Sequence, residues 1–112
     1  MNLNIEYYTR SNRTSPIQEF INELPDKAQV KTIETFGLLR DYGLEVGMPH
    51  IRPLSGMQGT WEVRIKSNKN IYRYPFIIEG GTAVILHAFA KKTQKTPEKE
   101  LKMIKRRTKE IL

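Results

Sequence analysis

The sequence predicts an α+β fold built on a small, mainly antiparallel sheet. Apolar residues recur at helical spacing in residues 15–42 and again in residues 96–111, whereas residues 60–90 alternate as strands do. The helices are thus segregated from a run of strands joined by short turns, which is typical of α+β proteins. The 112 residues suit one core, so we expect a single domain over residues 1–112.

The chain opens with a predicted strand and a helix. Residues 4–8 alternate between apolar and polar side chains, as a half-buried strand does. Ser15, Pro16 and Gln18 predict a helix start, because serine is a favoured N-cap, proline suits the first helical position and Gln18 completes a capping box. Apolar side chains then follow at helical spacing and should form one buried stripe: Ile17, Phe20, Ile21 and Leu24.

A second helix is expected directly after the first. Pro25 breaks the first helix, Asp26 can cap the next, and Gly43 stands where a C-terminal glycine belongs. We expect the two helices to form a helical hairpin. The residues of the second helix expected to face the core are Val30, Ile33, Phe36 and Leu39. Glycines and prolines interrupt residues 43–59, which predicts a long loop.

Three strands should follow this loop. Residues 60–66 and 71–78 alternate on either side of a turn, and residues 82–90 are nearly all apolar, which indicates a central strand. If residues 67–70 form the turn, Lys66 pairs with Ile71 and the apolar residues of the first two strands share one face. That expected core face comprises Trp61, Val63, Ile65, Tyr72, Tyr74 and Phe76.

The same register predicts an anion site on the opposite face of the sheet. It places Arg64 directly opposite Arg73, and two arginines across a ladder repel each other. An anion between them would relieve the repulsion, and planar guanidinium groups suit a phosphate. The alternative is structural: each arginine lies flat and pairs with Glu62 or another carboxylate.

The placement of His87 depends on the turn before its strand. A three-residue loop at residues 79–81 would put His87 opposite Arg73 on the cationic face, whereas a four-residue turn would put it on the core side. The first placement gives His87 a role in proton transfer. The second makes it a satisfied core residue, the commoner fate of a lone histidine in an apolar strand. The other histidine, His50, lies in the predicted loop and is expected to be solvated, with contact to the substrate as the lesser alternative.

A final helix is predicted after Thr96 and Pro97, which repeat the cap-plus-proline signal. Leu101, Ile104 and Ile111 should pack it onto the body of the protein. Basic residues crowd its other faces. Together with two lysines outside the helix they form the candidate RNA-binding set, which is Lys66, Lys95, Lys102, Lys105, Arg106 and Lys109.

The charge of the chain is unevenly distributed. The net charge is +7, but residues 1–60 carry 6 Lys/Arg and 7 Asp/Glu, whereas residues 61–112 carry 13 and 5. A basic half attracts polyanions, of which nucleic acid is the commonest. The chain has no cysteine, and no carboxylate cluster accompanies either histidine, so we expect neither a metal nor another cofactor. It shows no signal peptide and no membrane span, which favours a cytoplasmic protein without a membrane partner.

Such a set of cations can still cleave RNA, because RNA carries its own nucleophile. The 2′-hydroxyl attacks the adjacent phosphorus, and the protein must position it, neutralise the developing charge and move protons. Arginines can supply the charge, and a lysine crowded by other cations can act as an acid or a base. The candidates for this chemistry are Arg64, Arg73, Lys91, Lys92 and His87.

Three stretches of the sequence resemble a known family of toxins. They are L-S-G-M-Q-G-T-W-E-V-R-I-K from Leu54, N-I-Y-R-Y from Asn70 and L-H-A-F-A-K-K-T-Q-K-T-P from Leu86. Together they resemble the RelE/HigB toxin superfamily, and most closely the phage-derived HigB-like branch of type II toxin–antitoxin systems. The resemblance covers nearly the whole chain.

The resemblance implies a RelE/ParE-like fold and a ribosome-dependent, metal-independent mRNA endoribonuclease that inhibits translation. It implies neutralisation by a helix-turn-helix antitoxin of the HigA kind, and contact with operator DNA only through the antitoxin complex. Arg64 and Arg73 match the strand arginines of the family, and Lys91 and Lys92 match its basic residues after the last strand. Other branches place a tyrosine or histidine near the C-terminus, and the last four residues, 109–112, contain neither.

Two other functions fit the same pattern of residues. A ParE-like protein would share the fold but inhibit DNA gyrase and cleave nothing. A non-catalytic nucleic-acid-binding module would stack bases on Tyr72 and Tyr74, although the register above buries both tyrosines.

Overall fold

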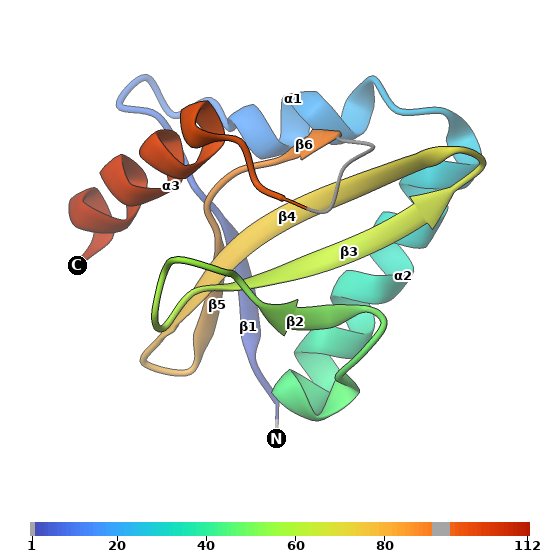
Figure 1. Ribbon diagram of the computed structural model, residues 1–112, viewed down its shortest axis with the longest axis horizontal. Helices are drawn as coiled ribbons and strands as arrows, with labels where there is room; N and C mark the ends of the chain where they lie inside the picture. Colours follow the sequence, from blue (N-terminus) through green and yellow to red (C-terminus); the bar gives the residue numbers. More distant parts are fainter. Residues whose placement is uncertain (1, 91–94) are drawn as a thin grey trace.

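A computed structural model describes residues 2–90 and 95–112 and shows an α+β fold with a mixed sheet (Figure 1). The α+β class is therefore confirmed. The described elements, in chain order, are β1 (Asn4–Tyr7), α1 (Pro16–Asn22), α2 (Asp26–Tyr42), the 3₁₀ helix η1 (Gly43–Val46), β2 (Ile51–Pro53), β3 (Trp61–Ser67), β4 (Asn70–Glu79), β5 (Thr82–Ile85), β6 (Phe89–Ala90) and α3 (Glu98–Ile111).

The sheet is mainly antiparallel, as predicted. Its strand order is β1-β5-β4-β3-β2, and β6 pairs with β4 beyond the end of β5. Only the pair of β1 and β5 is parallel among the described strands. A parallel pair needs a long crossover, and here the two helices and the β3–β4 hairpin lie between its strands.

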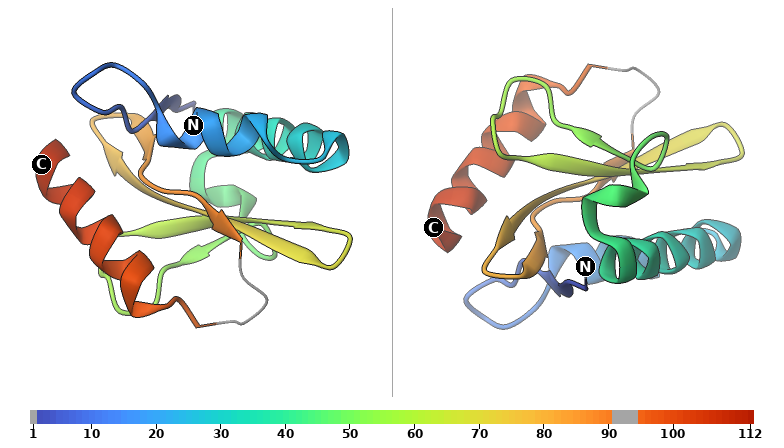
Figure 2. Two further views of the ribbon diagram at one scale, coloured as in Figure 1. Left: turned by 90° about the horizontal axis from the view of Figure 1, so that it is seen from above. Right: turned by 90° about the horizontal axis from the view of Figure 1, so that it is seen from below.

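Helices cover both faces of the sheet. Figure 2 shows α1 and α2 in one layer on one face and α3 on the other side. The start of α1 is as predicted, because the Ser15 hydroxyl accepts hydrogen bonds from the backbone N–H groups of Ile17 and Gln18 at 3.2 and 3.3 Å. Pro25 precedes α2, and Asp26 is its first residue but makes no capping bond. The finer arrangement of α1 and α2 as a RelE-like hairpin stays a prediction.

The buried face of α2 differs from the expected one. Val30 and Ile33 were expected inside, yet their exposed fractions are 57% and 53%. Thr32 and Thr35 are buried instead, because their hydroxyls find partners: Thr32 bonds the Tyr74 hydroxyl at 2.9 Å, and Thr35 donates to a carbonyl of the preceding turn at 2.7 Å. Relative to the orientation that would bury only apolar residues, α2 is therefore rotated about its axis. Its buried residues are Ala28, Thr32, Thr35, Phe36 and Leu39.

The predicted loop over residues 43–59 contains two short elements that the sequence did not reveal. The 3₁₀ helix η1 continues from α2, and β2 adds a strand to the sheet beside β3. In that pairing Arg52 lies directly opposite Glu62. Three residues between glycines and prolines are too few to produce a detectable alternation, so β2 forms through its pairing with β3 and not through its own pattern.

The register of the β3–β4 hairpin is as predicted. Lys66 pairs with Ile71, and Arg64 lies opposite Arg73. The expected core face packs beneath α1 and α2, and its buried members are Val63, Ile65, Tyr72, Tyr74 and Phe76.

The third predicted strand, residues 82–90, is broken into β5 and β6. Both turn lengths considered for residues 79–81 are wrong, because Glu79 pairs with Thr82 across a two-residue turn. The ladder is interrupted near Pro75, which has no N–H to donate and only accepts, from the Leu86 N–H at 2.8 Å. When pairing resumes, Arg73 lies opposite Phe89 and not opposite His87.

A second, smaller core fixes α3 to the sheet. Leu101, Ile104 and Ile111 face it, as the helical spacing predicted. Their partners on the body of the protein are Leu54, Met57, Ile77, Val84 and Leu86. No helix in the described part of the chain is long and apolar enough to cross a membrane.

Candidate nucleic-acid interface

The two strand arginines lie opposite each other but in different surroundings. Arg73 is 0% exposed, whereas Arg64 is half-buried. The Nε atom of Arg73 lies 3.7 Å from Oε1 of Glu62, which is itself only 1% exposed. Arg73 therefore has the structural role that was the alternative to an anion site, because it pairs with the buried carboxylate of Glu62. A phosphate clamped equally by both arginines does not fit this burial.

Glu62 holds a second arginine as well. Its Oε2 atom lies 3.6 Å from Nε of Arg52, whose side chain is 22% exposed. The carboxylate thus lies between Arg73 on one neighbouring strand and Arg52 on the other. Burial lowers the pKa of the Arg73 guanidinium and the charge of Glu62 opposes that change. We name the group of Arg52, Glu62, Arg64 and Arg73 the arginine cluster.

Arg64 is the member of the cluster that keeps free donors. Within residues 2–90 and 95–112, its guanidinium makes no hydrogen bond or ion pair, and its Nε atom is buried without a partner. Burial lowers the pKa of Arg64, the nearby charge of Arg52 lowers it further, and the charge of Glu62 opposes the change. A partly desolvated guanidinium without a hydrogen-bonded carboxylate keeps unsatisfied donors, so an incoming anion gains more there than at a solvated arginine.

Two hollows border the arginine cluster. One, of about 840 Å³, lies between the β2 region and the start of α3 and is lined by Arg52, Glu62, Lys95 and Leu101, among others. The other, of about 420 Å³, lies between β3, α2 and the segment before β2, and Arg64, His50 and Lys66 contribute to its wall. Arg64 therefore stands next to a cavity large enough for a small ligand.

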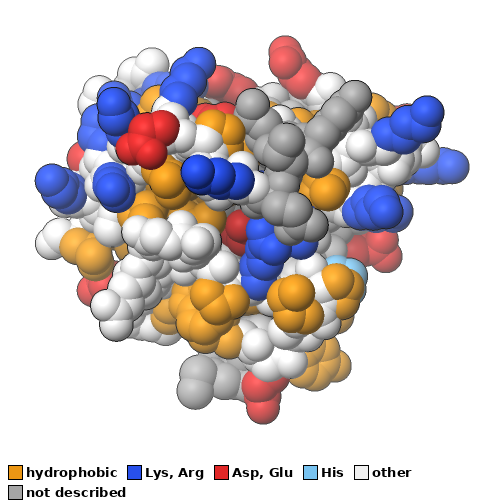
Figure 3. Space-filling model, viewed as in Figure 1, with side chains coloured by type: hydrophobic (Ala, Val, Ile, Leu, Met, Phe, Trp, Pro, Cys, Tyr) orange, Lys and Arg blue, Asp and Glu red, His pale blue; other side chains and the backbone are white. Residues whose placement is uncertain are grey.

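The remaining predicted cations fall into three groups. Lys91 and Lys92 lie outside the described residues. Lys66 and Lys95 are exposed at the two hollows. The four α3 residues of the candidate RNA-binding set face solvent, as predicted, and Figure 3 shows Lys and Arg side chains gathered over α3 and again in the middle of the same face. These exposed helix residues are Lys102, Lys105, Arg106 and Lys109.

His87 is placed apart from the arginine cluster. Its Nε2 atom is 2.9 Å from Oε1 of Glu100, its Nδ1 atom is 3.2 Å from Arg107, and its ring stacks on Phe89. Only 14% of the side chain is exposed, and burial lowers its pKa although Glu100 opposes the change. Both ring nitrogens are thus occupied in docking α3. The placement of His87 opposite Arg73, one of the two alternatives, is not observed, because Phe89 lies opposite Arg73 when pairing resumes.

Two residues of these sites, Arg107 and Arg52, were missed by sequence reasoning. Arg107 was hidden in the basic run of α3, yet it is buried, donates to the Leu86 carbonyl at 2.8 Å and lies 4.6 Å above the Tyr8 ring. Arg52 was missed because β2 was not recognised. His50 was expected to be solvated; it is exposed, but its carbonyl accepts the Arg64 N–H at 2.7 Å, which ties it to β3.

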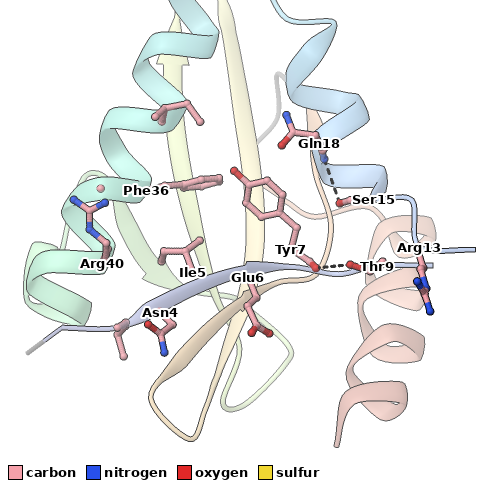
Figure 4. A pocket seen from close by; sticks show the side chains of 13 residues that line it. Asn4, Ile5, Glu6, Tyr7, Thr9, Arg13, Ser15, Gln18, Phe36 and Arg40 are labelled. Atoms are coloured by element: carbon pink, nitrogen blue, oxygen red, sulfur yellow. Dashed lines mark hydrogen bonds between the residues drawn. The ribbon is translucent and has the colours of Figure 1, made fainter. Parts of the chain in front are cut away.

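The described residues contain no group of three or more His, Asp or Glu side chains that could hold a metal ion. A further groove, of about 940 Å³, runs beside β1 on the side of α1 and α2. Figure 4 shows Ile5, Tyr7 and Phe36 converging on its wall, with Arg40 and Arg13 at its margins. Its centre is apolar, and it shares no lining residue with the two hollows of the arginine cluster.

Residues 19–109 match the family model of phage-derived Gp49-like proteins. The chain belongs to this Gp49-like family. The match begins within α1, ends within α3 and includes the arginine cluster. The family is a toxin-like family of toxin–antitoxin systems, so an antitoxin is the kind of partner that membership suggests. No curated protein sequence matches the chain.

Proposed function

We propose that this Gp49-like protein is the toxin of a type II toxin–antitoxin system and an endoribonuclease that cleaves mRNA on the ribosome. The single observation that carries the proposal is Arg64. Its partly desolvated guanidinium has no carboxylate partner among the described residues, although Glu62 lies on the same strand and face. Membership of a toxin-like family and the basic C-terminal half support the same function.

The proposed reaction needs no nucleophile from the protein. The 2′-oxygen loses its proton to a base and bonds to phosphorus, the P–O5′ bond breaks, and the departing 5′-oxygen takes a proton. The products are a 2′,3′-cyclic phosphate and a 5′-hydroxyl end. Arg64 would hold the phosphate and oppose the extra negative charge of the transition state. Arg73 and Arg52 act through Glu62 as positioning residues, because they fix the strand that presents Arg64.

The acid and the base are not assigned to described residues. Lys91 and Lys92 keep this role as a proposal carried by the family resemblance. His87 is a weaker candidate than the sequence suggested, because Glu100 and Arg107 occupy its two ring nitrogens. The alternative of a base-stacking module that uses Tyr72 and Tyr74 is disfavoured, since both rings are buried beneath α1.

The proposed antitoxin should act by covering the arginine cluster or by blocking access to the ribosome through its bulk. An unpartnered guanidinium is a natural docking point for an acidic side chain. A helix-turn-helix antitoxin of the HigA kind, with operator DNA contacted only through the complex, is the partner we propose. A complex that leaves Arg64 open and still cleaves mRNA would contradict this mode of inhibition.

The decisive experiment incubates purified protein with mRNA, with and without ribosomes, and maps the ends of the products. Cleavage only on ribosomes, with cyclic phosphate ends, is expected. Arg64→Gln should lower the single-turnover cleavage rate by about 100-fold, the loss typical of removing one transition-state donor. The matched control is Lys27→Gln, an exposed cation at the start of α2. Inhibition of gyrase supercoiling without any RNA cleavage would replace this proposal with the ParE-like function.

A further inference from the structure

The smaller hollow beside Arg64 has the composition of a nucleotide site. Two exposed lysines, Lys31 and Lys66, join Arg64 and His50 around it, and Glu34 is its one carboxylate. Cations therefore outnumber anions by three to one before any charge on the histidine is counted. Surrounded in this way, a bound phosphate would be held by several donors at once.

The same hollow also has apolar walls. Pro49, Ile65 and Ile71 contribute to its lining, and a cavity of about 420 Å³ is within the usual range for small-molecule sites. A simple anion would leave these apolar surfaces in water. A nucleotide would use both parts, because its base and sugar can cover carbon while its phosphate meets the cations.

The backbone fixes the two groups that matter most in this arrangement. The Arg64 N–H donates to the His50 carbonyl at 2.7 Å, and the His50 N–H donates to the Gly47 carbonyl at 3.1 Å. In addition, Nζ of Lys31 donates to the Lys66 carbonyl at 3.0 Å and joins α2 to β3. The walls are thus connected to each other before any ligand arrives, which lowers the ordering cost of binding.

We propose that this hollow is a nucleotide subsite, in which Arg64 and His50 contact the phosphate of one ribonucleotide of the RNA and Pro49 and Ile71 contact its base or sugar. The proposal rests on the proposed function for the identity of the polymer. It replaces His87 with His50 as the histidine that touches the RNA, because His50 lines the same hollow as Arg64 whereas His87 lines a different one.

The test uses the two histidines of the chain as internal reporters. Imidazole ¹⁵N–¹H spectra of the full chain are assigned with His50→Gln and His87→Gln and recorded during titration with adenosine 3′-monophosphate, adenosine or inorganic phosphate at constant ionic strength. The nucleotide should shift the signals of His50 and leave those of His87 in place. It should bind about tenfold more tightly than phosphate or adenosine alone, which corresponds to roughly 1.4 kcal/mol from using both parts of the site.

Two variants complete the test. Arg64→Gln should weaken nucleotide binding by at least about tenfold, the effect of removing one charge-assisted hydrogen bond. Lys69→Gln should leave it unchanged, because Lys69 is an exposed cation in the β3–β4 turn outside the hollow. The inference is overturned if His50 signals do not move at saturation, if His87 responds instead, or if phosphate binds as tightly as the nucleotide.

The same samples separate this inference from the function on which it rests. If the nucleotide shifts His50 but mRNA on ribosomes stays intact, the subsite stands and the nuclease function fails. If mRNA is cleaved equally by the wild type and by His50→Gln while His50 ignores the nucleotide, the nuclease function stands and the subsite is elsewhere. His50→Gln is suited to this comparison because the residue is exposed and its side chain is not needed for the core.

Discussion

Removing Arg73 should destabilise the protein strongly, even though Arg73 faces another arginine across the sheet. Arg73→Met takes one arginine away from Glu62, which is 1% exposed, and leaves it with Arg52 at 3.6 Å. Deleting the sole partner of a buried charge typically costs about 3–5 kcal/mol. Glu62 keeps Arg52, so the cost here should lie at the lower end of that range, about 3 kcal/mol. At roughly 4 °C per kcal/mol for a domain of this size, Tm should fall by about 12 °C.

The assay is thermal and urea unfolding of a double-mutant cycle. Glu62→Met combined with Arg73→Met removes both charges, so it should recover most of the stability, since apolar replacement of a buried pair is often neutral or stabilising. Arg64→Met is the matched control from the opposite position in the ladder, and it should cost less than about 1 kcal/mol because the guanidinium has no ion-pair partner in the described part of the chain. The reasoning is refuted if Arg73→Met costs no more than Arg64→Met, or if the double variant is destabilised by the sum of the two single effects.

Three further predictions concern His87, the start of α1 and the exposed face of α3. Burial lowers the pKa of His87 below its ordinary value of 6.5, so the unfolded chain takes up a proton before the folded chain does as the pH falls through 6.5. The free energy of unfolding should therefore decrease below this pH, by at most about 1.4 kcal/mol per pH unit. His87→Gln should remove this dependence of Tm on pH, whereas His50→Gln should not. Ser15→Ala should cost about 1 kcal/mol in urea unfolding, because two N–H groups at the start of α1 lose their acceptor, and an unchanged midpoint would contradict the cap. Replacing three exposed cations of α3 by glutamine should weaken ribosome binding, most strongly at low salt. The slope of affinity against salt should fall by roughly one unit for every phosphate that is no longer neutralised, while codon preference stays as it was. An unchanged slope would show that α3 does not contact ribosomal phosphates. The replaced residues are Lys105, Arg106 and Lys109.

The sequence predicted those parts of the fold in which the local pattern of apolar and polar residues is enough to determine the structure. The alternation in residues 60–78 has a single register that places its aromatic rings on the core face, so Arg64 opposite Arg73 followed directly. The cap at Ser15 is likewise a local signal with a local cause. Elements that depend on a distant partner were not visible: β2 exists because β3 offers it an edge, and the strand containing His87 breaks because Pro75 on another strand cannot donate.

The candidate site was predictable in its residue types but not in their burial. Charge patterns locate cations along the chain, yet they do not say which cation loses its water. Arg73 and Arg107 are buried with partners, whereas Arg64, two residues from Glu62 on the same face, keeps free donors within the described residues. In the same way α2 buries Thr32 and exposes Val30, because the Tyr74 hydroxyl satisfies the threonine. Whether each of these residues is buried depends on a hydrogen-bond or ion-pair partner on another helix or strand. The pattern of a single sequence does not reveal that partner.

The charge balance of the arginine cluster opposes folding and favours the binding of an anion. Its three arginines and one carboxylate give it an excess of positive charge in a partly desolvated place. An apolar or neutral set would stabilise the sheet better, because buried ion pairs rarely repay their desolvation. Binding one phosphodiester halves the excess positive charge of the cluster and gives the Arg64 donors an acceptor. The excess positive charge therefore destabilises the folded protein and stabilises its complex with an anion. This combination is expected of a site that binds a polyanion.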